Sequence, residues 1–482
     1  MYRELKQLGL AFGIGFLLVA LSSAYWGLFT AERILARKDN PRRVQVEHQL
    51  QRGQIVDRNG ITLAEGTQAQ RNYPYTGMEG AIGYYDFQFG ASSLEAAFDD
   101  ILRGAVGETD VWLEFENSLF HRDKVGFDLR STLDLTIQQT LHDNMGDYPG
   151  AGVVVYVPSG DILAMVSQPG FDPHDIEPYL DENGEPIHEN TPLFNRVRQG
   201  GYQPGSLIEL ILLAGLYTVE TPTQMPFSNG TQPLDVSLFD LPVDTLTCLV
   251  EPPTTQSLTL EELFVYGCPT HFVLALGDLL PLNGYQSLLK EAGFLEAPPV
   301  HRLDTDISAT PVPLADTSLP ENLTLTAIGQ SDFVINILQM VRFVASIANQ
   351  GNAPVLHLAD AYRLPDSAEW IALDIPRRQP AILRQDVALQ LRQALLFAAQ
   401  RSPFVQSAQR TDFAIRDYKL HAQVGVAYAG EPLVWFVGFL DLQDGTSLAI
   451  VIVIEGTTNP DIVAQIAGNT LQSAILALEG TP

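Results

Sequence analysis

The longest uninterrupted run of apolar residues lies near the start of the chain. Residues 8–29 ("LGLAFGIGFLLVALSSAYWGLF") carry no charge over 22 positions. As a helix that rises about 1.5 Å per residue, this run is long enough to cross a bilayer core of roughly 30 Å. A cleaved signal peptide is the alternative, but its apolar region would be shorter and a small-residue cleavage site would follow it. The pattern therefore favours an uncleaved, single-pass membrane anchor.

Basic residues flank this apolar run on both sides. Two precede it and five follow it, namely Arg3, Lys6, Arg33, Arg37, Lys38, Arg42 and Arg43. A bare positive-inside count would place the large remainder of the chain in the cytoplasm. Long domains can translocate despite such charges, however, so this count alone leaves the orientation open.

Strand and turn patterns begin after a polar, basic stalk at residues 31–51. Residues 52–66 ("RGQIVDRNGITLAEG") predict two strands around a turn at Asn59 and Gly60. Residues 90–104 ("GASSLEAAFDDILRG") predict a helix that ends at its last glycine. We therefore expect a small β-rich domain over residues 52–130.

A second, larger domain is predicted over residues 131–482. It starts with a helix at 131–145 behind a Ser/Thr/Asp cap and a β-hairpin at 151–169. It ends with three apolar strand patterns ("KLHAQVGVAY", "LVWFVGFLDL" and "TSLAIVIVIEG") and an amphipathic helix at 459–480. Helices are predicted between these two parts, among them 259–267, 270–294 and one that ends at Gly351. This order predicts an α/β (α+β) fold with one antiparallel sheet packed between helices.

One predicted helix carries a candidate nucleophile at its start. Residues 207–217 ("LIELILLAGLY") are apolar on nearly every face except at Glu209, so this helix is expected to be buried all round. Ser206 directly precedes it, an arrangement suited to acyl transfer. A serine hydroxyl is a weak nucleophile until a base takes its proton, and the residue one helical turn on is Glu209.

Composition excludes several other kinds of function. The chain has 57 acidic and 28 basic residues and a net charge of −29, so no basic surface is left to bind nucleic acid. The nine histidines show no metal-binding spacing, and we expect neither a metal nor a cofactor. Cys248 and Cys268 make no metal site by themselves. They could pair in an oxidising compartment or remain buried thiols.

Several fragments, in this order and spacing, resemble class B penicillin-binding proteins, which are membrane-anchored peptidoglycan transpeptidases. "RGQIVDRNGITLA" and "GASSLEAAFDDILRG" resemble parts of that family's non-catalytic pedestal domain. "GVVVYVPSGDILAMVSQPGFDP", "LFNRVRQGGYQPGS" and "WFVGF" resemble parts of its transpeptidase domain. The resemblance implies a large domain outside the cytoplasm and four segments: a cytoplasmic tip and anchor (1–30), a stalk (31–51), a pedestal (52–130) and a transpeptidase-like domain (131–482).

The chemistry of that family depends on three motifs, and all three are altered here. The aligned residues are Ser206 to Glu209 for Ser-x-x-Lys, Gly267-Cys268-Pro269 for Ser-x-Asn, and Gln423-Val424-Gly425 for Lys-Thr-Gly. Losing one general base typically costs about 10² to 10⁴ in rate, and losing a whole catalytic unit roughly 10⁶. The two lysines that would attract the substrate carboxylate are replaced by Glu209 and Gln423. Gly267 and Gly425 are expected to mark close backbone approaches.

The resemblance and these changes together predict a catalytically inactive scaffold or regulator of cell-wall synthesis, in division or elongation. Its expected partners are cell-wall synthesis proteins and peptidoglycan or muropeptides. A buried carboxylate at Glu209 would tend to be protonated, and Ser206 would then serve as a helix N-cap. One alternative is an active D,D-transpeptidase or carboxypeptidase that uses Glu209 as a remodelled base, or Cys268 as nucleophile. Another is a sensor of muropeptides or β-lactams.

Overall fold

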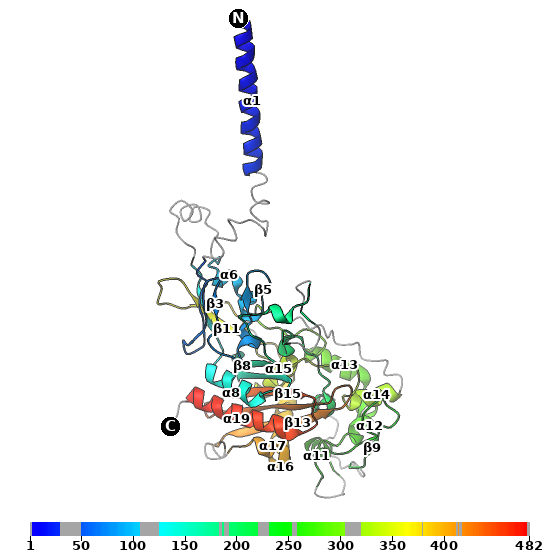
Figure 1. Ribbon diagram of the computed structural model, residues 1–482. Coiled ribbons are helices and arrows are strands. Elements are labelled where there is room, and N and C mark those ends of the chain that lie inside the picture. The colour runs from blue at the N-terminus through cyan, green and yellow to red at the C-terminus, as the bar shows by residue number, and fades with distance from the viewer. Residues whose placement is uncertain are drawn as a thin grey trace.

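A computed structural model shows a small mixed domain next to a larger domain in which helices cover a central sheet, with the N-terminal helix apart from both (Figure 1). The structure describes residues 2–28, 50–106, 125–182, 186–187, 192–219, 231–252, 258–303, 320–377, 379–410, 413 and 417–479. The predicted stalk lies outside the described residues, apart from its last two positions.

The segment predicted to be a membrane anchor is helical. Helix α1 (Tyr2–Leu28) has 27 residues and contains all of the apolar run except Phe29. Several of its large apolar side chains are exposed, including Phe12 and Phe16. Among the residues that the structure describes, however, no helix is both long and apolar enough to span a bilayer. The expected transmembrane segment at residues 8–29 is therefore not confirmed.

The small domain is built on a six-stranded sheet that the sequence predicted only in part. The predicted hairpin is present as β1 (Ile55–Val56) and β2 (Thr62–Gly66), with Gly60 in the turn at a φ of 86°. The other strands are β3 (Arg71–Asn72), β6 (Asp128–Ser131), β11 (Ala359–Arg363) and β12 (Ile371–Ala372), in the order β12-β11-β6-β1-β2-β3. Two of these strands thus come from deep within the larger predicted domain.

The predicted helix at residues 90–104 is divided into two short helices. The sheet is accompanied by α4 (Glu79–Ile82), α5 (Ser93–Ala97), α6 (Asp99–Leu102) and the strand pair β4 (Tyr85–Asp86) and β5 (Gly90–Ala91). Phe98 separates α5 from α6 with a non-helical backbone (φ −120°, ψ 26°) and is itself buried. Gly104 lies just beyond α6 at a φ of 72°, near the predicted end.

A buried ion-pair network holds the small domain together. Glu95 is fully buried, and its two oxygens lie 2.7 Å from Nε of Arg52 and 2.7 Å from Nε of Arg71. Arg52 also reaches Asp99 at 2.6 Å. Burial would raise the pKa of Glu95, but the two arginines hold it below its usual range. This carboxylate therefore stays ionised in the interior.

The larger domain contains the predicted antiparallel sheet. Its strands are β7 (Gly150–Val157), β8 (Asp161–Gln168), β13 (Lys419–Ala427), β14 (Leu433–Asp441) and β15 (Ser447–Glu455), in the order β13-β14-β15-β7-β8. Alternate residues enter two different cores: Val153 and Trp435 belong to one, and Val154 and Phe436 to the other. Both faces of this sheet are therefore buried, which explains why its strands are apolar almost throughout.

Helices cover each face of this sheet, as predicted (Figure 1). One layer contains α8 (Leu135–Met145), α17 (Pro403–Ala408) and α19 (Pro460–Glu479), and the other α15 (Ile337–Ala348) and α16 (Gln385–Arg401). Asp134 caps α8 by accepting hydrogen bonds from the amides of Thr136 and Ile137, which confirms the predicted cap. The predicted sheet between helices is thus confirmed.

The middle of the chain adds a helical lobe beside the sheet. Its elements are α9 (Arg196–Gln199), α10 (Ile208–Thr218), α11 (Leu260–Tyr266), α12 (Thr270–Asp278), α13 (Leu282–Glu291), α14 (Pro320–Ala327) and the short strands β9 (Leu234–Asp235) and β10 (Thr245–Leu246). The predicted helix at 270–294 is divided, because Pro281 has an extended ψ of 143° ahead of α13. Helix α10 is buried along almost its whole length, as predicted.

Candidate active-site cleft

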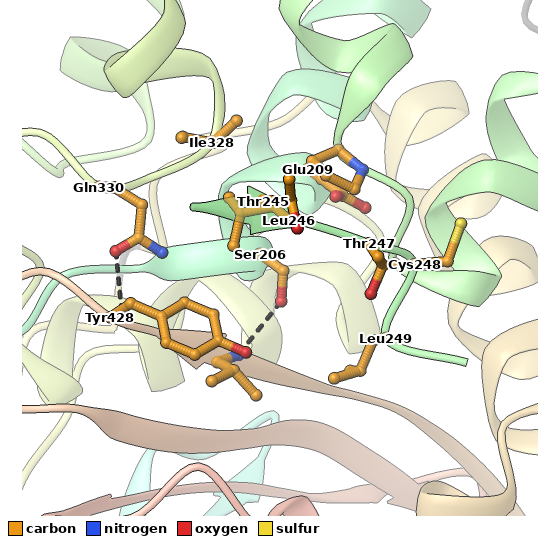
Figure 2. Close-up of a pocket in the computed structure, with 13 residues that line it drawn as sticks. Ser206, Glu209, Thr245, Leu246, Thr247, Cys248, Leu249, Ile328, Gln330 and Tyr428 are labelled. Atoms are coloured by element: carbon orange, nitrogen blue, oxygen red, sulfur yellow. Dashed lines mark hydrogen bonds between the residues drawn. The ribbon is translucent and has the colours of Figure 1, made fainter. Parts of the chain in front are cut away.

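The sequence-predicted serine lies in a pocket between the helical lobe and the end of β13. This pocket has a volume of about 190 Å³, and Figure 2 shows most of its side chains turned toward a common space. Its lining comes from five short segments: Ser206 and Glu209; Thr245, Leu246, Thr247, Cys248 and Leu249; Gly267 and Pro269; Ile328 and Gln330; and Val426 and Tyr428.

Ser206 lies in a short 3-10 turn, η2 (Gly205–Leu207), that leads into α10. Its Oγ accepts a hydrogen bond from the amide of Val426 on β13 at 3.2 Å (Figure 2). No side-chain capping bond is made at the start of either η2 or α10. The predicted N-cap role is therefore wrong: the preceding turn continues into the helix, and the hydroxyl points to the neighbouring strand instead.

Glu209 lies one turn further along, inside α10. Only 1% of the residue is exposed, and neither carboxyl oxygen has a hydrogen-bond partner among the described residues. Burial raises the pKa of this carboxyl well above its usual range. This direction is the one expected for a buried carboxyl at this position, and it favours the protonated form. In its protonated form this carboxyl could not take the proton of Ser206.

The residues aligned with the Ser-x-Asn motif, Gly267 to Pro269, include a cysteine that forms a disulfide. Gly267 ends α11 in the left-handed conformation at a φ of 59°, and Cys268 forms a disulfide with Cys248. The loop that carries Cys248 is held in place because the amide of Leu249 donates to the carbonyl of Gly267 at 3.1 Å. Cys268 is therefore no free nucleophile, and the open question of cysteine pairing is answered.

The third motif position lies on β13 and faces the protein interior. Nε2 of Gln423 donates to the carbonyl of Phe264 at 2.7 Å, so its amide is engaged with α11. Val424 belongs to the core on one face of the sheet. A Cβ on Gly425 would lie 2.5 Å from Cγ of Leu207, which confirms the expected close approach. None of these three residues is among those that line the pocket.

The structure thus brings four of the predicted site residues around one pocket, namely Ser206, Glu209, Gly267 and Pro269. It adds residues that the sequence reasoning missed, notably Gln330 and Tyr428. Oε1 of Gln330 accepts from the amide of Tyr428 at 2.8 Å and so ties the turn after α14 to the end of β13. Tyr428 is the last residue of the predicted strand, and this position was the only available signal for it.

The charge of the pocket differs from what an anionic substrate needs. Among its described lining residues, none is a lysine, arginine or histidine, and the only acid is Glu209. An incoming carboxylate would therefore meet no counter-charge at the walls of this pocket. The described residues also contain no group of three or more side chains that could hold a metal ion.

Comparison with known proteins identifies the family. The profile of the penicillin binding protein transpeptidase domain matches residues 150–472. The chain is 26% identical to the peptidoglycan D,D-transpeptidase PbpA of Mycolicibacterium smegmatis over 506 residues, which cover 98% of this chain and 99% of that protein. The corresponding protein of Mycobacterium tuberculosis is 26% identical over 502 residues, 96% of each chain.

Solved structures show the same architecture. Penicillin-binding protein A from M. tuberculosis, in an imipenem acyl-enzyme complex, matches with a TM-score of 0.73 at 24% identity and covers 89% of this chain and 99% of its own. The D,D-transpeptidase domain from Eggerthella lenta gives a TM-score of 0.72 at 22% identity, with the same coverage. This chain belongs to the class B penicillin-binding-protein family, and its larger domain has the transpeptidase fold.

Proposed function

We propose that this chain works in cell-wall synthesis as a non-catalytic scaffold or regulator, binding partner proteins or peptidoglycan without turning over peptide. The observation that supports this most directly is Glu209. It is buried, has no hydrogen-bond partner among the described residues, and lies one turn beyond Ser206, where the resembled motif would carry a lysine. An uncharged acid at that position activates no nucleophile.

The surroundings of Ser206 support the same conclusion. The hydrogen bond that its Oγ accepts comes from the amide of Val426, and an amide donor does nothing to remove the hydroxyl proton. Gln423 is engaged with Phe264 and does not line the pocket. These contacts support the proposal that the site neither activates the nucleophile nor attracts a substrate carboxylate.

The proposal includes a location outside the cytoplasm. The disulfide between Cys248 and Cys268 supports it, since structural disulfides form and persist in oxidising compartments and are rare in the cytosol. The relatives named peptidoglycan D,D-transpeptidases act on a polymer of the cell wall, which is consistent with that compartment.

A second candidate function is a sensor of muropeptides or β-lactams. The observation in its favour is that the pocket remains open beside Ser206, with the hydroxyl groups of Thr245 and Thr247 among its lining residues. A neutral ligand could bind such a pocket through hydrogen bonds without acylating the serine. An active enzyme with Glu209 as a remodelled base is disfavoured by the protonation of that carboxyl.

Labelling with a fluorescent penicillin tests the proposal. The full chain and its Ser206→Ala variant are incubated with the probe, beside M. tuberculosis penicillin-binding protein A, for which a penicillin G acyl-enzyme is known. We expect a covalent band for the control alone. A band on this chain that disappears in Ser206→Ala would contradict the non-catalytic assignment. If there is no label, calorimetry with a muropeptide follows. Saturable heat would favour a sensor or a scaffold that binds peptidoglycan, and its absence would favour a scaffold that binds only partner proteins.

A further inference from the structure

A second, larger pocket is lined by residues of the helical lobe and of the segment before α16. One of its lining residues, Arg342, forms no ion pair with a described acid. The volume of this pocket is about 590 Å³, within the range typical of small-molecule sites. The walls come from the end of α13 and the following loop, from α15, and from the segment that leads into α16. It shares no lining residue with the pocket at Ser206.

Arg342 lies on α15 and reaches this pocket from within the protein. The residue is only 8% exposed, yet it lines the cavity. Its Nε is fully buried without a hydrogen-bond partner, and no ion pair joins its guanidinium to any acid among the described residues. Gly293 locates the guanidinium at the pocket wall, because a Cβ on that glycine would lie 3.0 Å from Nη1.

The nearby carbonyl oxygens are already occupied by a different side chain. Nε2 of Gln339, one turn before Arg342, donates to the carbonyls of Gly293, Phe294 and Glu296 at 3.3, 3.2 and 2.7 Å. No hydrogen bond joins Nε of Arg342 to these carbonyls. Burial lowers the pKa of Arg342, and no neighbouring acid offsets the effect. Nε is enclosed, and Nη1 lies beside Gly293 in the pocket wall, so the terminal nitrogens are the donors available to a ligand.

The other charged residues in the lining favour a ligand with a single negative charge over one with two. Lys290 and Arg384 also line it, and Arg384 pairs with Asp386, its Nε lying 3.0 Å from Oδ1. Glu291 and Glu296 are the acids in the lining. These two carboxylates in the lining would repel a doubly charged phosphate more strongly than a single carboxylate. A guanidinium binds one carboxylate well through paired N–H donors.

The rest of the lining is apolar. It consists of Ala297, Pro299, Pro380, Ala381, Ile382 and Leu383. We propose that this pocket binds a small ligand with one carboxylate, held by Arg342, and an apolar body, packed against Ile382 and Leu383. This site is independent of the chemistry at Ser206, so this proposal and the proposed function can each fail without affecting the other.

The test uses N-acetylleucine as the probe, because it combines one carboxylate with a branched apolar side chain. Binding to the full chain is measured by ligand-observed NMR on the leucine methyl signals. We expect saturable binding of N-acetylleucine, and binding at least about tenfold weaker for the uncharged N-acetylleucinamide, because the charge-assisted hydrogen bonds are lost. Inorganic phosphate is titrated in parallel and is expected to bind more weakly than N-acetylleucine.

The decisive variant is Arg342→Gln, with Arg363→Gln as a matched control. Both remove one positive charge, but Arg363 lies on β11 and pairs with Asp128. Arg342→Gln should bind N-acetylleucine at least about tenfold more weakly and keep or raise the thermal midpoint, since a buried charge without a partner is costly to fold. Arg363→Gln should bind as the parent chain does.

Three results would overturn the assignment. They are failure of the parent chain to bind N-acetylleucine, unchanged binding by Arg342→Gln, and tighter binding of phosphate than of the carboxylate. The thermal midpoint of Arg342→Gln is measured beside its binding. If the midpoint is not below that of the parent chain, a loss of binding is not a folding defect; a lowered midpoint would itself contradict an arginine without a counter-charge.

Discussion

Glu95 in the small domain and Glu209 in the cleft are both withdrawn from solvent, with exposed fractions of 0% and 1%. Glu95 is contacted by Arg52 and Arg71, and its pKa lies below the usual range in spite of burial. Glu209 has no hydrogen-bond partner among the described residues, and its pKa lies well above that range. The surroundings of the same side chain thus favour its charged form in one domain and its neutral form in the other.

This difference shows that burial does not by itself set the charge of a carboxyl group. The fold keeps the charge where it supplies counter-charges at hydrogen-bond distance, and suppresses it where it supplies none. In the small domain the ionised network serves stability. In the cleft, the raised pKa favours the neutral form of Glu209, and the proposed non-catalytic role depends on that form.

The largest expected effect comes from removing the anion of the small domain. Glu95→Gln leaves Arg52 and Arg71 buried without their shared carboxylate, and breaking a buried ion pair in this way typically costs about 3–5 kcal/mol. We expect a clear fall in the urea midpoint of the full chain. The exposed Glu369→Gln variant should unfold like the parent chain. Equal midpoints for both variants would show that the network contributes little.

The next effect concerns the covalent bridge beside the cleft. The disulfide links residues that are 20 positions apart, and closing a loop of that size is worth about 3 kcal/mol in the chain-entropy model. The double variant Cys248→Ala with Cys268→Ala should therefore unfold at lower urea concentration. Dithiothreitol should lower the midpoint of the parent chain similarly and leave the double variant unchanged. A parent chain insensitive to the reductant would contradict this.

A pH series sharpens the comparison between the two glutamates. Folding raises the pKa of Glu209 above its ordinary value of 4.5. The stabilising contribution of this residue is therefore present below pH 4.5 and is lost as the pH rises from 4.5 toward the folded-state pKa. Relative to Glu209→Gln, the parent chain should lose up to about 1.4 kcal/mol per pH unit in that window. Urea unfolding of both proteins at several pH values measures this.

Glu95 should show the opposite sign in the same series. Its lowered pKa means that its stabilising contribution is present above its ordinary pKa and is lost as pH falls through the folded-state value. The difference in stability between the parent chain and Glu95→Gln should therefore shrink on acidification. If both glutamate variants shifted in the same direction with pH, the contrast drawn from their surroundings would be wrong.

The smallest expected effect belongs to Ser206. Ser206→Ala removes one hydrogen bond, accepted from the amide of Val426, and a typical net contribution is about 1 kcal/mol. Thermal unfolding should show a small decrease or none, and amide exchange at Val426 should become faster. A large loss of stability would mean that the hydroxyl holds η2 against β13 more strongly than a single contact implies.

Local patterns predicted most of the sheet and several of the helices. The five strands of the larger domain follow from apolar runs with turns between them, and Asp134 caps α8 as its position suggested. The burial of Glu209 followed from a helix that is apolar on its other faces. These features depend on near neighbours in the sequence, where periodicity carries information.

Other features depend on contacts between distant segments, which one sequence does not reveal. β11 pairs with β6 although Ala361 and Arg130 are 231 positions apart, so the small domain was assigned too few strands. The role of Ser206 was misjudged because capping depends on where the preceding backbone turns. Arg342 stands out only once the structure shows that Gln339 occupies the carbonyls around it.

The close backbone contacts around Ser206 have a wider consequence. A Cβ on Gly205 would lie 2.1 Å from the carbonyl oxygen of Val426, and one on Gly329 would lie 2.2 Å from that of Gly205. Together with Gly425 against Leu207, these contacts place three stretches of main chain directly against one another. A side chain at Gly205 or Gly329 would force these stretches apart, so the position of Ser206 relative to β13 depends on both glycines. A substitution at either glycine would therefore change the geometry of the cleft without changing any of its polar side chains.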